Sequence, residues 1–303
     1  MMNTRPLIQF IPTLTAALML SACAPKLIET PKRVDEAITV SHPAAVTELT
    51  ILSEGARLPG LIYQAAGAGP HPTALFLHGY PGNERSLDVA QAVRQNGWNA
   101  VYFNYRGAWG AEGEFSFRHA EADVQNAIQT LSDPDTAQEL RIDPHQIALV
   151  GHSMGGHMAL AGLLDNPKVR CAVSYDGANM GANGTGLFSS EQAKTLWKNY
   201  SDTLFMLTGW SGQKALDEIS QHGSALDLLP RLATLEERPV LILAADTEVI
   251  PMDVHINPLV EAIRAKNPDQ VRLKIIPDDH SFSNHRPRII QETQDFLDQY
   301  CRA

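Results

Sequence analysis

The chain has 303 residues, of which 44% are hydrophobic and 19% are charged, and its formal net charge at pH 7 is −10. This balance is typical of a globular protein with a sizeable core, and it excludes a disordered or wholly membrane-embedded chain. The sequence contains no run of Lys and Arg that would follow a phosphate backbone, so nucleic acid is not an expected partner.

The first 22 residues have the pattern of a signal peptide. Arg5 is their only charged residue, and residues 7–20 form an apolar run that is too short to span a bilayer as a helix. The run ends in Leu20-Ser21-Ala22-Cys23, which resembles the lipobox of bacterial lipoproteins. This resemblance implies that Cys23 carries a lipid and becomes the mature N-terminus. The alternative is an ordinary cleaved signal in which Cys23 is incidental.

The segment after Cys23 is predicted to be a tether. Residues 23–46 contain three prolines, mixed charges and no sustained periodicity. We therefore expect an exported chain held on a bacterial membrane, on its periplasmic or surface side. Ala24 resembles the signal for outer-membrane sorting if the source is Gram-negative. The rest of the chain, residues 47–303, is predicted to form a single domain.

Strands and helices are predicted to alternate along this domain. Residues 48–52 and 61–64 are expected to pair as an antiparallel hairpin. The other candidate strands are apolar on both faces, and they are residues 73–77, 99–105, 146–150, 169–175, 239–244 and 271–276. The candidate helices are residues 86–96, 121–131, 156–164, 253–266 and 288–300. This alternation predicts an α/β fold with a mostly parallel, doubly wound sheet.

One long excursion interrupts the alternation. The segment from Gly177 to Arg238 is first rich in Gly, Ser and Asn and then mostly helical. Long insertions between core strands are often lids. We therefore expect a small helical cap over about residues 180–237, inserted before the strand at 239–244.

The pattern Gly151-His152-Ser153-Met154-Gly155 lies between a predicted strand and a predicted helix. A nucleophilic serine at such a turn is lifted above the sheet, and the flanking glycines let strand and helix approach closely. The N–H groups at the start of the helix then face the place where negative charge develops. Ser153 is therefore the candidate nucleophile.

A second motif, His78-Gly79-Tyr80-Pro81-Gly82, follows the strand at 73–77. Together with the serine motif it resembles the α/β-hydrolase superfamily, and the resemblance covers nearly all of the predicted domain. It implies that the backbone N–H groups of Tyr80 and Met154 form an oxyanion hole. It also implies that His78 shapes its loop and that Arg106, in Asn104-Tyr105-Arg106-Gly107, holds a turn.

The catalytic base is expected after the last strand, where this superfamily carries it. His280 lies in Pro277-Asp278-Asp279-His280 directly after the strand at 271–276, and His285 is the alternative. An imidazole at this place can take the serine proton and return it to the leaving group.

The triad acid is expected just beyond the strand at 239–244. Asp246 is the first carboxylate there, and Glu248 is the alternative. Asp253 is interpreted instead as a carboxylate at the start of a helix. The spacing from Asp246 to Pro251 departs slightly from the family pattern. The predicted triad is Ser153, Asp246 and His280, in the chain order of the superfamily.

These motifs predict a serine hydrolase that cleaves carboxylic esters through an acyl-enzyme. A serine peptidase or an aminoacyl hydrolase is the alternative, and a catalytically silent, surface-tethered binding protein is an alternative of another class. No metal or organic cofactor is expected, and the expected ligand is a small or medium-sized ester or acyl compound. Whether Cys171 and Cys301 pair is left open by the sequence.

Overall fold

The computed structural model describes residues 41–182, 190–245, 247 and 249–302. The chain divides into two units, Met1–Thr39 and Val40–Ala303, and every described residue belongs to the second. The predicted signal peptide, Cys23 and most of the predicted tether lie outside the described residues. Among the described residues, no helix is long and apolar enough to cross a membrane.

An eight-stranded sheet forms the centre of this unit, in the order β1-β2-β4-β3-β5-β6-β7-β8. Its first two strands form an antiparallel hairpin, β2 pairs antiparallel with β4, and all later pairs are parallel. The strands are β1 (Ala45–Ser53), β2 (Ala56–Gln64), β3 (His71–Leu77), β4 (Asn99–Phe103), β5 (Ile142–His152), β6 (Val169–Tyr175), β7 (Val240–Ala245) and β8 (Val271–Ile276). The predicted hairpin and the predicted mostly parallel sheet are therefore confirmed.

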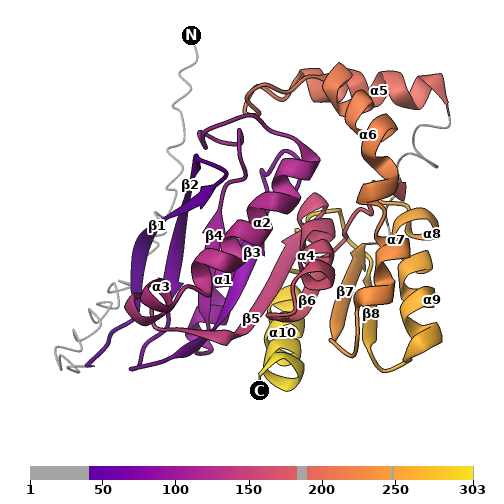
Figure 1. The fold of residues 1–303 in the computed structure, drawn as a ribbon. Coiled ribbons are helices and arrows are strands. Elements are labelled where there is room, and N and C mark those ends of the chain that lie inside the picture. The colour runs from indigo at the N-terminus through magenta and orange to yellow at the C-terminus, as the bar shows by residue number, and fades with distance from the viewer. Residues whose placement is uncertain (1–40, 183–189, 246, 248, 303) are drawn as a thin grey trace, which may run out of the picture. The chain divides into compact units, whose positions relative to one another are not determined.

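Helices cover both faces of the sheet (Figure 1). Apolar side chains of α1 and α10 pack on one face, and those of α2, α4 and α9 pack on the other. The helices of the core are α1 (Leu87–Gln95), α2 (Phe117–Leu131), α3 (Pro134–Glu139), α4 (Met154–Asp165), α8 (Met252–His255), α9 (Asn257–Lys266) and α10 (Arg286–Phe296). The central strands are buried on both faces, which explains why they are continuous apolar runs.

Local capping sets two helix boundaries that the apolar pattern did not predict. Helix α2 begins at Phe117, four residues before the predicted start, because the Ser116 hydroxyl accepts a hydrogen bond from the His119 N–H at 3.0 Å. The short helix α3 was not predicted at all. Its first turn is capped by Asp133, whose carboxylate accepts the Thr136 N–H at 3.1 Å.

Between β6 and β7, where a cap was expected, the described part of the chain is mostly helical. Its helical segments are α5 (Glu191–Asp202), α6 (Gly212–Leu226), α7 (Leu228–Arg231) and the 3₁₀ turn η3 (Leu232–Thr234). In Figure 1, α5 and α6 lie at the top of the view, beyond the carboxyl ends of the parallel strands. We refer to α5, α6 and the residues that connect them as the cap.

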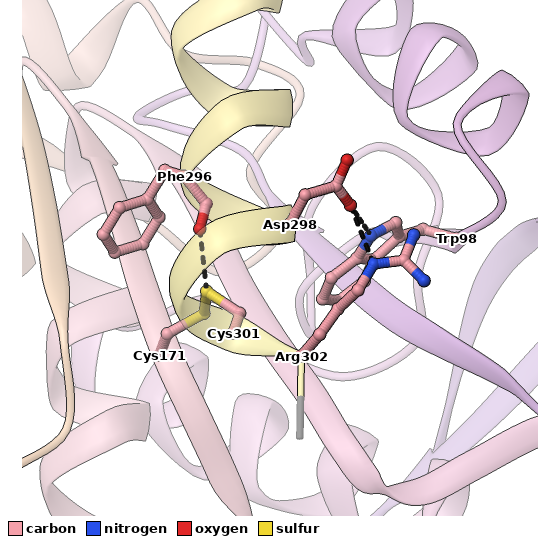
Figure 2. Close-up of a disulfide and its surroundings, with 6 residues drawn as sticks. All are labelled: Trp98, Cys171, Phe296, Asp298, Cys301 and Arg302. Atoms are coloured by element: carbon pink, nitrogen blue, oxygen red, sulfur yellow. Dashed lines mark hydrogen bonds and ion pairs between the residues drawn. A yellow bond between two sulfur atoms is a disulfide. The ribbon is translucent and has the colours of Figure 1, made fainter.

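A disulfide joins Cys171 in β6 to Cys301, which ends the π-helical turn η4 (Leu297–Cys301) after α10 (Figure 2). Both cysteines are fully buried, and 130 residues separate them in the chain. A second contact also joins β6 to the C-terminal helix: the Tyr175 hydroxyl lies 2.5 Å from the Thr293 hydroxyl of α10. The C-terminal helix is thus fixed to the strand that lies next to β5 in the sheet.

Candidate active site

Ser153 occupies a sharp turn between β5 and α4. Its backbone has φ 59° and ψ −120°, a conformation that residues other than glycine rarely adopt. The neighbouring glycines are required by close packing. A Cβ on Gly151 would lie 1.9 Å from the Gly155 carbonyl oxygen, and a Cβ on Gly155 would lie 1.9 Å from the Leu77 carbonyl oxygen. Only glycine fits at either position, as the strand–turn–helix motif requires.

His280 lies in the segment between β8 and α10, as predicted. Its Nδ1 donates to Asp176 Oδ2 at 2.5 Å, and the Asp176 carboxylate is fully buried. With Nδ1 protonated, Nε2 of the neutral imidazole is the free acceptor. His280 and Ser153 line the same cavity, which has a volume of about 160 Å³. The structure therefore brings a serine and a carboxylate-paired histidine to one pocket.

Asp176 was not predicted as a site residue, yet among the described residues it is the carboxylate that pairs with His280, whereas the predicted acid, Asp246, lies outside them. Asp176 directly follows β6 with φ 44°, and its Oδ1 accepts the N–H of Ala245 at 3.0 Å. Both carboxylate oxygens are therefore engaged, and Oδ2 is fixed on the imidazole. Nδ1 carries a single proton, and the hydrogen bond to Asp176 occupies it.

Of the three carboxylate candidates from the sequence, only Asp253 is described, and no hydrogen bond or ion pair joins it to His280. Asp246 and Glu248 lie outside the described residues. Asp253 is exposed in the first turn of α8, in agreement with its interpretation as a helix-start carboxylate. The alternative base, His285, is the N-cap residue of α10, and its Nδ1 lies 2.8 Å from Asp278 Oδ2.

The loop after β3 passes directly beside the serine. A Cβ on Gly79 would lie 2.9 Å from Ser153 Cβ, so this loop could not approach as closely with any other residue. Neither the Tyr80 N–H nor the Met154 N–H donates a hydrogen bond within the part of the chain that the structure describes. Both are thus free donors next to the serine, at the two positions that the sequence predicted for an oxyanion hole.

The side chain of Tyr80 connects this loop to the cap. Its hydroxyl donates to Ser201 Oγ at 2.8 Å and accepts the Trp210 indole N–H at 2.7 Å. The ring stacks on Trp197 with centroids 5.4 Å apart. Burial raises the pKa of the Tyr80 hydroxyl to about 12, so it is a neutral hydrogen-bonding group. Local sequence patterns could not predict this contact, because its partners lie more than a hundred residues away in the chain.

Two further histidines shape the site from within the core. His78 Nδ1 donates to the Gly79 carbonyl at 2.8 Å, and burial lowers the pKa of His78 to about 4. His152 Nε2 donates to the His280 carbonyl at 2.7 Å, so the residue before the serine holds the backbone of the candidate base. Burial, and then the nearby His280, lower the pKa of His152 to about 3. Both imidazoles are therefore neutral at pH 7.

Arg106 holds a turn at the end of β4, as predicted. Its guanidinium donates to Asp123 Oδ1 from Nε at 3.0 Å and from Nη2 at 2.8 Å. Its backbone N–H donates to the other oxygen of the same buried carboxylate at 2.7 Å.

The described residues contain no cluster of three or more His, Cys, Asp or Glu side chains that could hold a metal ion.

Curated relatives match part of this chain. A 2,6-dihydropseudooxynicotine hydrolase from Paenarthrobacter nicotinovorans is 27% identical over 140 residues, which are 46% of this chain and 36% of the relative. An uncharacterized protein from Mycobacterium tuberculosis is 29% identical over 127 residues, which are 41% of this chain and 43% of the relative. The matches thus span less than half of the length of these relatives.

Solved structures share the fold over most of the chain. A 2,6-dihydroxy-pseudo-oxynicotine hydrolase has a TM-score of 0.63 at 21% identity, covering 86% of this chain and 69% of its own. An esterase from Pyrococcus furiosus has a TM-score of 0.61 at 14% identity, with 87% and 95% covered. An acylaminoacyl peptidase from Pyrococcus horikoshii has a TM-score of 0.63 at 17% identity, with 85% and 42% covered.

The model of the alpha/beta hydrolase family matches residues 74–290, which include both sequence motifs and the segment that carries His280. The match extends over more than half of the chain and from within β3 through the last strand, β8. The predicted fold is therefore confirmed, and the chain belongs to the alpha/beta hydrolase family.

Proposed function

We propose that this chain is a serine hydrolase that cleaves carboxylic esters through an acyl-enzyme on Ser153, with His280 as the base and Asp176 as the acid. The observation that carries the proposal is the Asp176–His280 hydrogen bond of 2.5 Å beside a cavity that Ser153 also lines. A buried carboxylate on Nδ1 fixes the imidazole tautomer and stabilises its charged form during the reaction. Asp176 takes the role that the sequence analysis gave to Asp246.

In the acylation step, His280 Nε2 takes the proton of Ser153 Oγ while that oxygen attacks the carbonyl carbon of the ester. The carbonyl oxygen becomes an oxyanion, which the free N–H groups of Tyr80 and Met154 stabilise. The C–O bond then breaks, and the alcohol leaves with the proton from His280. In deacylation, water gives a proton to His280 and attacks the acyl carbon; the bond from this carbon to Ser153 Oγ then breaks, His280 returns the proton to Oγ, and the carboxylic acid leaves.

A panel of p-nitrophenyl esters and aminoacyl anilides tests the proposed reaction. The small cavity, about 160 Å³, favours short acyl groups, so we expect kcat/KM to fall as the acyl chain lengthens. Ester hydrolysis that is lost in Ser153→Ala supports the proposal. Hydrolysis of anilides alone would support the peptidase alternative, and a folded protein that hydrolyses neither would support the binding alternative.

We also propose that the chain is exported and anchored through a lipid on Cys23. The buried Cys171–Cys301 disulfide supports export, because such bonds form and persist in oxidising compartments. Replacing Cys23 by Ser should release the protein from the membrane fraction or leave it unprocessed. Mass spectrometry that finds an unlipidated mature N-terminus at another residue would contradict the anchor.

A further inference from the structure

Two side chains in the catalytic pocket have no part in the proposed mechanism. Glu84 belongs to the loop that follows the oxyanion residues, and Tyr200 belongs to the last turn of α5 in the cap. Both line the cavity of about 160 Å³ that contains Ser153 and His280. Any substrate that reaches the serine therefore lies close to a carboxylate and an aromatic ring.

The Glu84 carboxylate keeps one oxygen available. Its Oε1 accepts the Ser86 N–H at 2.5 Å and lies 3.7 Å from Arg286 Nη2, whereas Oε2 has no hydrogen-bond partner among the described residues. Arg286 forms this long ion pair with Glu84, but Asp88 also binds its guanidinium, at 2.5 and 2.8 Å, so the three side chains together keep one net negative charge. The side chain of Glu84 is 32% exposed and lines the cavity, so a ligand in the cavity can reach this carboxylate.

Tyr200 supplies the apolar part of the same wall. Its residue surface is 44% exposed, and its ring meets the Tyr80 ring edge-on with centroids 6.0 Å apart. Its hydroxyl donates no hydrogen bond to another described residue. A tyrosine ring and a carboxylate that line the same small cavity can together attract an ammonium group, through cation–π attraction and a charge-assisted hydrogen bond.

We propose that Glu84 and Tyr200 form an ammonium subsite in the catalytic pocket, and that the preferred substrate is a small ester or amide whose acyl group carries a protonated amine. This inference rests on the proposed serine-hydrolase function and specifies its substrate class. The small cavity places the amine within a few bonds of the reacting carbonyl. The net charge of −10 raises the local concentration of such cations.

A pair of nearly isosteric esters isolates the charge. In the p-nitrophenyl ester of alanine an ammonium group takes the place of one methyl group of p-nitrophenyl isobutyrate. The quantity measured is the ratio of kcat/KM for the alanyl ester to kcat/KM for the isobutyrate. We expect Glu84→Gln to lower this ratio about 10- to 100-fold, the range for loss of a hydrogen bond to a charged group. Glutamine can still accept the Ser86 N–H, so the loop is retained.

Three more variants complete the test. Tyr200→Leu, which removes the ring, should lower the ratio by roughly 2- to 30-fold, and Tyr200→Phe should preserve it. Glu261→Gln removes the same charge from the exposed face of α9, and it should leave the ratio unchanged. If Glu84→Gln does not fold, the two Tyr200 variants decide the question.

The outcomes separate this inference from the function on which it rests. An unchanged ratio in both Glu84→Gln and Tyr200→Leu would overturn the ammonium subsite while ester hydrolysis stands. A wild-type enzyme that hydrolyses the isobutyrate but not the alanyl ester would also overturn it. If the wild-type enzyme hydrolyses neither ester, the proposed function fails and the subsite fails with it.

Discussion

Asp176 Oδ2 lies 2.5 Å from His280 Nδ1, although 104 residues separate the two in the chain. The sheet order explains the contact, because β6 and β8 both pair with β7, and both residues lie beyond the carboxyl ends of these strands. The N–H of Ala245, at the end of β7, holds the second carboxylate oxygen at 3.0 Å. Three neighbouring strand ends thus fix one carboxylate on one imidazole.

Asp176→Asn is expected to be almost inactive. Asparagine can still accept the Ala245 N–H, but it cannot stabilise the imidazolium, and the comparable change in a serine protease costs about 10⁴ in kcat. The measurement is kcat/KM on a p-nitrophenyl ester, with circular dichroism to verify the fold. Asp253→Asn, in the exposed first turn of α8, is the matched control and should keep its activity. An active Asp176→Asn together with an inactive Asp246→Asn would restore the sequence prediction.

The sequence patterns predicted a serine and a histidine that line one cavity, but they did not point to Asp176, the carboxylate that pairs with this histidine. Ser153 and His280 follow from local patterns, a strand–turn–helix motif and a position after the last strand. For the acid, more than one predicted strand is followed by a carboxylate that could take this role. The signal that could have found Asp176 is that it directly follows the apolar strand 169–175 and precedes Gly177. Carboxyl ends of parallel strands collect functional groups, so this aspartate was as well placed as Asp246.

Contacts across the chain were beyond the reach of local patterns. The Tyr80 hydroxyl meets Ser201 and Trp210 because the cap folds back over the oxyanion loop. No periodicity in the sequence encodes that return. The Cys171–Cys301 pairing likewise depends on where the last helix lies on the sheet. The fold class, in contrast, follows from alternating apolar runs and amphipathic segments, and these were visible from the sequence.

Gly79→Ala is expected to impair catalysis more than stability. The added Cβ would lie 2.9 Å from Ser153 Cβ and 3.1 Å from the His152 carbonyl oxygen, so the oxyanion loop must move away from the serine. Loss of one oxyanion donor typically costs about 10²- to 10³-fold in kcat. Gly223→Ala in α6 is the control, because its nearest neighbour would lie at 3.8 Å. Normal kcat in Gly79→Ala would show that this loop does not supply an oxyanion donor.

Removing the disulfide should destabilise the domain. Replacing both Cys171 and Cys301 by Ala is expected to lower the free energy of unfolding by about 2–5 kcal/mol, because the cross-link restricts the unfolded chain. Urea unfolding of the wild type with and without a reductant, compared with the double variant, measures this effect. If the reductant and the double substitution both leave the unfolding midpoint unchanged, the bond does not stabilise the fold.

Acidification is expected to destabilise the protein from pH 6.5 downward. The pKa values of His78 and His152 are lowered to about 4 and about 3 in the folded state, so the unfolded state binds protons that the folded state cannot. The contribution of these two neutral histidines to the free energy of unfolding is fully present above pH 6.5, and it is lost as the pH falls toward the folded pKa values. Each histidine accounts for about 1.4 kcal/mol per pH unit in this window.

Urea unfolding of the wild type and His152→Gln at pH 7, 6 and 5 checks this dependence. The variant should lose about 1.4 kcal/mol per pH unit less than the wild type between pH 6 and 5. His145→Gln, at an exposed position on β5, is the matched control. Equal slopes for the wild type and His152→Gln would contradict a buried, neutral His152.

Labelling with a fluorophosphonate followed by peptide mass spectrometry tests the central claim most directly. Such probes react with a serine that a neighbouring base activates, so we expect a single adduct, on Ser153. Labelling should be absent from the folded Ser153→Ala variant and strongly slowed in Asp176→Asn. Undiminished labelling of folded Ser153→Ala, or an adduct on another serine of the wild type, would contradict the account.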